Sequence, residues 1–489
     1  MKREVSHPVS AGRCVRNVPG NSFSLQKKSA AADIMRETAG GSVRTKADEK
    51  RLIRYGLNLV AAVIMFAIAF RNYSIWDDEV FSLNLVDRPI GEMWAPIVKD
   101  LVHPPLYYYA LKLFLFLFPN DHLNMIAGAK LFSVIWVVIL MTAGSWLLER
   151  QRGADAALLF TVFLFGHTAI GYSVEIRMYS MAMCLAGLTC LSAMRLEEEA
   201  GTKNWLLFSA CSLLAAYTNY FALFSVSFFW LRRLVRFRKP EEMREWLKYA
   251  GLTAAGYLPW VITVLNHPSP ISDYAAEMTP SRILALFSFP FSCHNLPVSV
   301  ILIVCSAAVI LGIIRSSRMK EFALFCILNP AGIGLICIVS SILFRKFVIG
   351  RYLLPGWGVF WIGMAVGADS LKWKKWILPV FAAIDCLALV FIFQTEQNDR
   401  IAMNRLLETF RNEPLPVFAD QGAKTILDYV FYHPSYAESI ENNPSGRYYA
   451  FFWSDEWLLV GDKPMADEFP LSTGSLQVFQ DLPVSGEGS

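Results

Sequence analysis

Three consecutive carboxylates stand in the stretch WDDEVFSL, at Asp77, Asp78 and Glu79, shortly after a long apolar run. The preceding Trp76 is typical of a residue at a membrane interface. Since the three carboxylates fall within one helical turn, at least one should point toward the apolar segments rather than to water. Burial and neighbouring charges shift the pKa of such a group, as they do in catalytic bases. A single carboxylate here would usually be a solvated anchor, but three together favour acid–base chemistry.

The composition indicates a membrane protein. Of 489 residues, 55% are hydrophobic and 18% are charged, which departs from soluble domains in both respects. Apolar runs at 56–70, 298–314 and 376–393 approach the roughly 20 residues that cross a bilayer. The first run lies too far from the N-terminus for a secretory signal, so no cleavage is expected. The nine cysteines lack CxxC or CxxH spacing and predict neither disulfides nor a metal site.

The two ends of the chain differ in charge. Residues 1–54 carry 12 Lys/Arg against 5 Asp/Glu, whereas residues 394–489 carry 6 against 15. By the positive-inside rule, segment 1–54 is cytoplasmic, and the C-terminus is expected outside. The polar composition of the N-terminal segment predicts disorder. As an alternative, translation could begin at Met35, which leaves open whether residues 1–34 are part of the protein.

Clusters of Lys and Arg set the predicted turns of the membrane region, 55–393. Eleven spans follow, at 56–70, 127–148, 155–172, 179–194, 204–218, 220–233, 246–265, 298–314, 322–344, 352–371 and 376–393. The loop 71–126 is then external, and its apolar part, 105–118, is short enough to predict a juxtamembrane or re-entrant helix. The run 204–233 has basic clusters at both ends, so a break at AYTNYF is expected.

The last part of the chain, 394–489, predicts a small extracytoplasmic α/β domain. The pattern indicates a helix at 398–411, a strand in LPVFAD, a helix in KTILDYVFYH and a strand in RYYAFFW. This domain would cover the external opening or help to bind an acceptor, and a purely structural lid is the alternative.

Four polar motifs lie on the predicted external face. They are W-x-D-E at Trp76, Asp78 and Glu79, H-P-P-L-Y-Y at 103–108, E-x-R-x-Y at Glu175, Arg177 and Tyr179, and R-Y-L-L-P at 351–355. In this order the motifs resemble those of bacterial glycosyltransferase family 39, a group similar to protein O-mannosyltransferases and to the lipid A aminoarabinose transferase. The resemblance covers residues from about 55 to 370. It implies the GT-C fold, so we expect an all-α polytopic membrane protein with about eleven transmembrane helices and a small α/β C-terminal domain.

The resemblance implies inverting transfer of a hexosyl or pentosyl group from a polyprenyl-phosphate carrier to an acceptor hydroxyl on the extracytoplasmic side. A glycoside hydrolase needs two carboxylates, because its leaving group must be protonated. A phosphate leaves without an acid, so one base and cations for the phosphate are sufficient. Asp78 matches the family's catalytic Asp, and Glu79 matches the second acidic position, which orients or binds. Asp77 stands at the variable position of the motif.

Arg177 and Arg351 are the candidates for holding the lipid phosphate, since a guanidinium can bind two phosphate oxygens. Snorkelling at the interface is the alternative for one of them. Glu175 could pair with Arg177 or contact sugar hydroxyls. His103 is expected to enter the short helix through a fixed turn, and its imidazole could bond acceptor or phosphate.

The substrate-binding set that the resemblance implies also contains Tyr179, Tyr352 and Asn219. Where many family members have His between the fifth and sixth spans, this chain has Asn219, so an amide would have to replace an imidazole contact. Asp385 lies inside the last predicted span, where ionisable residues are often functional, but it stands outside the resemblance.

The sequence contains no nucleotide-binding loop, no DxD between predicted strands and no metal-ligand cluster. We therefore expect metal-independent transfer with no cofactor and no nucleic-acid partner. The expected partners are the polyprenyl-phosphate-linked sugar, membrane lipids and an acceptor that is a lipid, a protein or a cell-wall polymer.

Two alternatives remain open. A lipid-linked sugar transporter or flippase would have to use Asp385 and Lys130, although such proteins usually place charges near the midplane and show internal repeats. An oligosaccharide ligase of the same general fold would differ in the carrier that it accepts. A scaffold without activity would not account for four polar motifs on one face.

Overall fold

The structure is a computed structural model of the chain. It describes residues 45–480 apart from gaps at 73, 120, 166–170, 238, 268–278, 294, 344–348, 413–415, 420, 431–437, 440–448, 454–464 and 472–473. Residues 50–489 form one compact unit, separate from residues 1–49. Most of the N-terminal segment predicted to be disordered lies outside the described residues.

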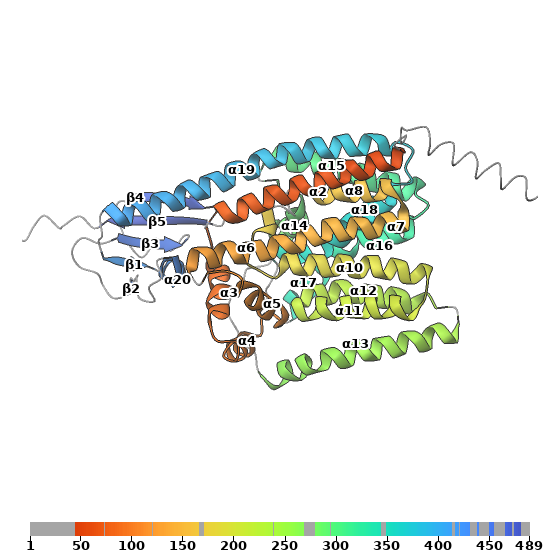
Figure 1. Ribbon diagram of the computed structural model, residues 1–489, viewed down its shortest axis with the longest axis horizontal. Coiled ribbons are helices and arrows are strands. Elements are labelled where there is room, and N and C mark those ends of the chain that lie inside the picture. The colour runs from red at the N-terminus through yellow and green to blue at the C-terminus, as the bar shows by residue number, and fades with distance from the viewer. Residues whose placement is uncertain are drawn as a thin grey trace, which may run out of the picture. The chain divides into compact units, whose positions relative to one another are not determined.

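Helices make up most of the described chain (Figure 1). The first half contains α2 (Lys46–Arg71), α3 (Asp77–Asp87), α4 (Trp94–Asp100), α5 (Leu106–Leu115), α6 (His122–Ile139), the π-helical turn η1 (Leu140–Gly144), α7 (Ser145–Arg152), α8 (Ala154–Phe165), α10 (Tyr179–Glu198), α11 (Thr202–Thr218) and α12 (Tyr220–Val235). The second half contains α13 (Pro240–Asn266), α14 (Pro280–Ser288), η2 (Phe289–Phe291), α15 (Leu296–Ser316), α16 (Lys320–Ile327), α17 (Asn329–Leu343), η3 (Gly350–Leu353), α18 (Leu354–Ala368) and α19 (Lys374–Asn412).

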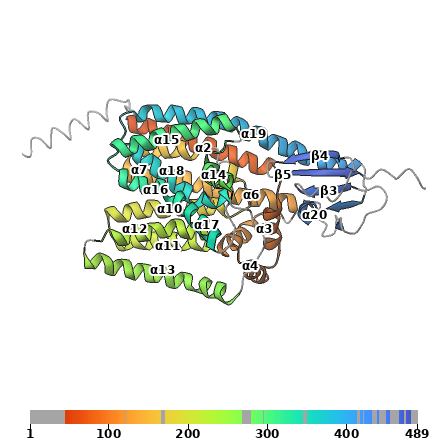
Figure 2. The same cartoon turned by 180° about the vertical axis from the view of Figure 1, so that it is seen from behind.

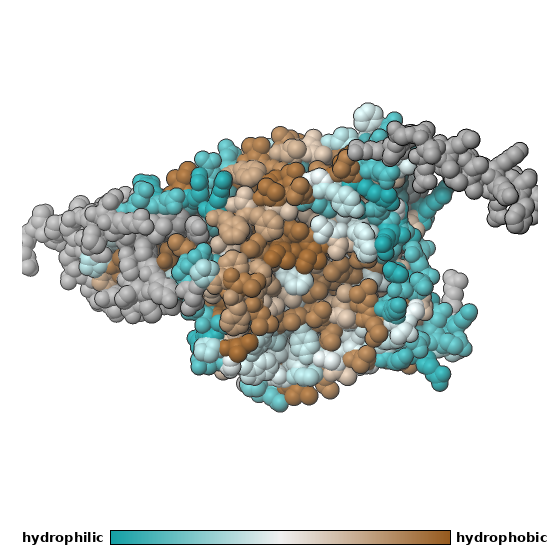
Figure 3. All heavy atoms as spheres, in the orientation of Figure 1, coloured by the Kyte–Doolittle hydropathy of each residue, from teal (hydrophilic) through white to brown (hydrophobic). Residues whose placement is uncertain are grey.

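The described residues contain six helices that are long and apolar enough to cross a membrane, at Lys46–Arg71, His122–Arg152, Tyr179–Glu198, Leu296–Ser316, Lys320–Leu343 and Lys374–Ala402. Figure 3 shows hydrophobic side chains gathered in a band across these helices, with hydrophilic residues beyond it. The protein is therefore a multi-pass membrane protein. Helices also occupy the other predicted spans, but α8, α11, α12 and α18 have only 12, 17, 16 and 15 residues. The count of eleven crossings stays a prediction.

The predicted break at AYTNYF is confirmed. Helix α11 ends at Thr218 and α12 begins at Tyr220, with extended backbone at Asn219. The Asn219 side-chain oxygen accepts hydrogen bonds from the backbone N–H groups of Phe221 and Ala222, at 2.8 and 3.3 Å. The same residue therefore ends one helix and caps the next.

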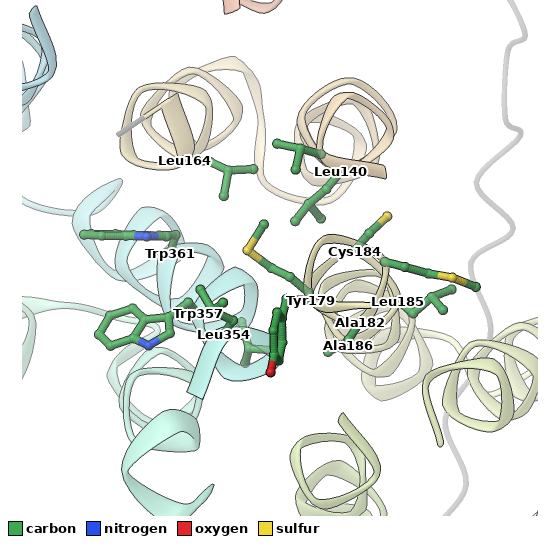
Figure 4. Packing of buried hydrophobic residues seen from close by; sticks show 14 of the residues in the cluster. Leu140, Leu164, Tyr179, Ala182, Cys184, Leu185, Ala186, Leu354, Trp357 and Trp361 are labelled. Carbon is green, nitrogen blue, oxygen red and sulfur yellow. The ribbon is translucent and has the colours of Figure 1, made fainter. Parts of the chain in front are cut away.

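The core lies around α10 and α18, which pack against each other (Figure 4). Every residue of α18 is buried. The close approach of α18 to its neighbouring helices depends on small residues, as is common between membrane helices. A Cβ added at Gly363 would lie 2.6 Å from the Cys326 Cβ and 2.7 Å from the Ala323 carbonyl oxygen of α16. Seen from behind, α15, α16 and α18 are neighbours (Figure 2).

Three short helices fill the loop 71–126, which was predicted to contain only one. The predicted re-entrant helix corresponds to α5, and the helical turn expected at the three carboxylates is the first turn of α3, whereas α4 was missed. Helix α3 begins with Asp77, Asp78 and Glu79, whose charges favour the positive end of the helix dipole. Figure 1 shows α3, α4 and α5 together at one end of the bundle.

Helix α19 is a single helix of 39 residues, although the sequence suggested separate helices at 376–393 and 398–411. The stretch QTEQN between them contains no Gly or Pro, so nothing ends the first helix. The boundary predicted at residue 394 therefore lies inside a continuous helix.

Beyond α19, the chain forms a five-stranded sheet with the order β2-β1-β3-β5-β4. The strands are β1 (Val417–Ala419), β2 (Glu438–Ser439), β3 (Tyr449–Trp453), β4 (Met465–Leu471) and β5 (Gly474–Gln480), and α20 spans Gln421–Val430. Strand β1 pairs in parallel with β2 and β3, whereas β3, β5 and β4 pair antiparallel. Helix α20 contacts α3 and α6, and the His122 ring of α6 stacks on Tyr429 at 4.1 Å.

Candidate functional site

Asp78 lies between two guanidinium groups. Its carboxylate accepts a hydrogen bond from Arg351 at 2.9 Å, and a second guanidinium nitrogen, from Arg177, is 3.8 Å away. The Asp78 side chain is 34% exposed, whereas that of Arg177 is only 4% exposed. The Arg351 guanidinium also lies over the Trp76 ring, 4.5 Å from its centroid. These contacts join the first, third and fourth sequence motifs in one cluster that remains open to solvent.

Arg177 is fixed by several acceptors. It donates to the Asp78 backbone oxygen at 2.9 Å and to the Ser82 hydroxyl at 3.3 Å, both on α3. A further guanidinium nitrogen lies 3.0 Å from His103 Nε2. Burial opposes the charge, but Asp78 and neighbouring tyrosines raise the pKa of Arg177 above its ordinary value. The guanidinium is therefore held in place before any substrate arrives.

His103 is buried, and its imidazole is neutral. Burial, Arg177 and Arg351 lower the pKa of His103 well below its ordinary value. Since Nε2 accepts from Arg177, Nδ1 carries the proton. Within the described residues Nδ1 is buried and has no hydrogen-bond partner, so its proton is an unpaired donor beside Arg177. The predicted role in bonding acceptor or phosphate stays a prediction.

Glu79 is engaged by the backbone on both carboxylate oxygens. One oxygen accepts from the Ile176 N–H at 2.7 Å, and the other accepts from the Trp76 N–H at 3.1 Å. Burial raises the pKa of Glu79, although Lys130 and these two N–H groups oppose the shift. Glu79 therefore caps α3 and ties it to the segment that carries Glu175 and Arg177.

Glu175 does not pair with Arg177 in the structure. Its side chain is half-buried, and one carboxylate oxygen has no hydrogen-bond partner among the described residues. Burial and the nearby Glu79 carboxylate raise the pKa of Glu175 to about 8. A carboxyl group with this pKa is mostly protonated at neutral pH and can then donate a hydrogen bond.

The remaining predicted residues lie around this cluster. Tyr352 follows Arg351 in η3, and its ring stacks on Phe221 at 4.3 Å. Tyr179 is buried at the first turn of α10. The Asn219 side-chain oxygen caps α12, but its amide nitrogen is buried and has no partner in the described part of the chain. Tyr179 and Tyr352 both lie within electrostatic reach of Arg177 and Arg351.

Sequence reasoning missed Asp100, which lies three residues before His103. Its half-buried carboxylate accepts from the Val102 N–H. Burial raises the pKa of Asp100, while Arg177 lowers it, and Asp78 raises it further. Asp100 therefore lies within electrostatic reach of Arg177 and Asp78 and is a further carboxylate near the site. Its place just ahead of the H-P-P motif was a signal that could have found it.

Lys130 was also missed as part of the support of this site. Its buried ammonium group donates to the backbone oxygens of Asn72 and Ser74, at 2.9 and 2.7 Å. The Asn72 side chain in turn donates to Glu396 of α19. This network fixes the turn that leads into Trp76 and α3.

Asp385 lies apart from the cluster. It is buried within α19 at 4% exposure, and one of its oxygens has no partner among the described residues. The described ranges contain no group of three or more His, Cys, Asp or Glu side chains that could hold a metal ion.

Comparison with known proteins identifies the fold. Two solved structures of ArnT from Cupriavidus metallidurans superpose on the chain with a TM-score of 0.59, one in the apo state and one bound to undecaprenyl phosphate. The identities are 11% and 13%, and each superposition covers 89% of this chain and 99% of the ArnT chain. The chain has the fold of ArnT. No family model matches the sequence, and no curated protein matches it.

ArnT is the lipid A aminoarabinose transferase, a GT-C glycosyltransferase. The resemblance inferred from the four sequence motifs is therefore confirmed at the level of the fold. The superposition extends beyond the range of about 55–370 over which the motifs suggested it, since it covers most of the chain.

Proposed function

We propose that the protein is an integral membrane glycosyltransferase of the GT-C type. It moves a sugar from a polyprenyl-phosphate carrier to an acceptor hydroxyl on the extracytoplasmic side. The observation that carries this proposal is the cluster of Asp78 with Arg177 and Arg351, which combines a partly exposed carboxylate with two cations at one end of the bundle. The undecaprenyl phosphate held by one ArnT structure supports the class of carrier.

In the proposed reaction, the guanidinium groups bind the oxygens of the carrier phosphate. Asp78 accepts the proton of the acceptor hydroxyl as its oxygen attacks the anomeric carbon of the sugar. The bond between that carbon and the phosphate oxygen breaks, and the polyprenyl phosphate leaves with the electron pair. Arg177 and Arg351 stabilise the developing charge. A single displacement inverts the anomeric centre.

Arg351 is suited to meet the phosphate. Its side chain is 23% exposed, against 4% for Arg177, so it can exchange Asp78 for a phosphate oxygen. That exchange would free Asp78 to accept a proton. Trp76 offers an aromatic face for the guanidinium during this movement.

The neighbouring polar groups position and bind the substrates, and they do not take part in the displacement of the phosphate. Glu79 is a positioning residue, because its oxygens hold two backbone N–H groups. The His103 Nδ1 proton and the protonated Glu175 can donate to phosphate or sugar oxygens. Tyr179, Tyr352 and Asn219 complete the proposed binding set.

The proposed topology has eleven spans, a cytoplasmic N-terminus and an extracytoplasmic C-terminal domain. Contact of α20 with α3 supports a role of that domain close to the proposed site, where an acceptor must enter. A lipid, a protein hydroxyl and a cell-wall polymer all fit this proposal, and so do hexosyl and pentosyl donors. An oligosaccharide ligase of the same general fold would differ from this proposal in accepting a carrier that bears a whole oligosaccharide.

Transport or flipping of the carrier is less favoured. Of the two residues that it requires, Lys130 bonds backbone oxygens beside α3 and so has a structural role. Asp385 remains, but it lies apart from the polar cluster.

The test is transfer by the full-length protein in detergent, supplied with a panel of polyprenyl-phosphate sugars and candidate acceptors. Release of polyprenyl phosphate together with a glycosylated product supports the proposal, whereas binding of all carriers without release would favour transport. A parallel reaction with a chelator tests metal independence. Loss of activity that a divalent ion restores would contradict it.

A further inference from the structure

Leu101 has a backbone conformation that L-residues rarely adopt. Its φ angle is 51°, in the left-handed region. Among the described residues, Leu101 is the one residue other than glycine that has a positive φ angle. It ends α4, and its N–H bonds the Ile97 oxygen at 2.9 Å. A bulky residue in this region costs on the order of 1–3 kcal/mol, so the surrounding structure must hold it there.

A chain of two hydrogen bonds holds this strained peptide. The Tyr220 hydroxyl, at the start of α12, donates to the Leu101 oxygen at 3.2 Å. The same hydroxyl accepts from the Trp260 indole N–H of α13, also at 3.2 Å. Since one bond polarises the next, such a chain restrains the peptide more firmly than a single bond.

Trp260 also contacts α4 directly, at the start of that helix. The Trp260 ring meets the Trp94 ring edge-on at 6.1 Å, and Trp94 is the first residue of α4. Trp260 is one of two residues of α13 that are buried; the other is Tyr249. The Trp260 indole of α13 therefore contacts the start of α4 directly and the end of α4 through the Tyr220 hydroxyl.

The residues on either side of Leu101 belong to the site. Asp100 precedes it and lies within electrostatic reach of Arg177 and Asp78. His103 follows two residues later and meets Arg177 at 3.0 Å. If Leu101 relaxed to a negative φ, the chain direction would change between these two side chains, and both would move relative to Arg177.

We propose that Tyr220 is a positioning residue, which, held by Trp260, keeps the Leu101 peptide in its strained conformation and so presents Asp100 and His103 to the Arg177 side of the site. The inference rests on the proposed function where activity is measured, but its structural part stands without it. Tyr220 makes no contact with the reacting atoms in this proposal and acts through the Leu101 peptide.

The test is a double-mutant cycle in the full-length protein. Tyr220→Phe removes the hydroxyl, and Leu101→Gly removes the strain, because glycine adopts positive φ readily. The matched control is Tyr217→Phe, since the Tyr217 hydroxyl also donates to a backbone oxygen, that of Gly256 in α13, at 2.8 Å.

We expect Tyr220→Phe to lower kcat/KM for the carrier about tenfold or more, and Tyr217→Phe to leave it nearly unchanged. In the Leu101→Gly background, Tyr220→Phe should cost much less than in the wild type. An equal loss in both backgrounds, or equal effects of Tyr220→Phe and Tyr217→Phe, would overturn the inference.

Amide hydrogen exchange over residues 100–103 provides a readout without activity. Tyr220→Phe should speed exchange there relative to both the wild type and Tyr217→Phe, and unchanged exchange would overturn the inference. If the wild type transferred no sugar while exchange behaved as expected, the proposed function would fail and the positioning would stand.

Discussion

Replacement of Glu175 by glutamine should change how the stability of the protein depends on pH. The unfolded chain ionises this residue near its ordinary pKa of 4.5, whereas the folded protein raises that pKa to about 8. Between these values the folded state binds more protons, so the free energy of unfolding falls as pH rises. The stabilisation is fully present below pH 4.5 and is lost as pH rises through about 8.

The magnitude follows from the shift. Each pKa unit corresponds to about 1.4 kcal/mol, so a change from 4.5 to about 8 sets an upper limit of about 5 kcal/mol. Because the Glu175 side chain is half-buried and water reaches part of it, we expect about 2 kcal/mol. Glu175→Gln removes the ionisable group and therefore this part of the pH dependence.

The assay is denaturant titration of the detergent-solubilised protein at several values from pH 5 to pH 9. Glu199→Gln is the matched control, since Glu199 is an exposed carboxylate at the end of α10 with one long ion pair to Arg195. The wild type and Glu199→Gln should lose stability more steeply toward high pH than Glu175→Gln. Parallel curves for all three proteins would refute the assignment of Glu175 as a protonated group.

Three further substitutions have defined outcomes. Arg351→Gln should weaken binding of undecaprenyl phosphate about 10- to 100-fold, because a charged hydrogen-bond donor is lost; unchanged binding in a titration would remove Arg351 from the phosphate site. Asn219→Ala should lower the free energy of unfolding, measured by denaturant titration, by about 1 kcal/mol through loss of the α12 cap, whereas Asn219→Ser keeps a neutral acceptor oxygen at this buried position and should cost less. Gly363→Ala should lower the free energy of unfolding by about 1–3 kcal/mol, because the added methyl group overpacks the contact between α18 and α16. In the control Gly251→Ala the added methyl group meets nothing within 4 Å, so this change should be neutral or stabilising. Equal effects of the two substitutions on thermal unfolding would contradict the close packing at Gly363.

The sequence predicted the features that depend on composition and local pattern. Apolar length and Lys/Arg clusters located the membrane helices, and the same charges predicted the break at Asn219. The four motifs named Asp78, Arg177 and Arg351. Their contact joins residues as far as 273 positions apart, and only the resemblance to a known family could bring them together before the structure was known.

The features that were missed depend on tertiary contacts or on weak local signals. Leu101 gave no sign of a positive φ, since glycine or asparagine is the usual residue there. Lys130 and Glu396 meet the α2–α3 turn from distant helices. By contrast, the bond from the Trp76 N–H to Glu79 is an i, i+3 capping contact, and its spacing was visible in WDDE.

The most direct test of the central claim compares wild type, Asp78→Asn and Asp77→Asn in transfer from a polyprenyl-phosphate sugar. We expect wild type and Asp77→Asn to release polyprenyl phosphate and form product, and Asp78→Asn to bind the carrier but transfer little sugar. Transfer by Asp78→Asn at the wild-type rate would show that the base is a different group.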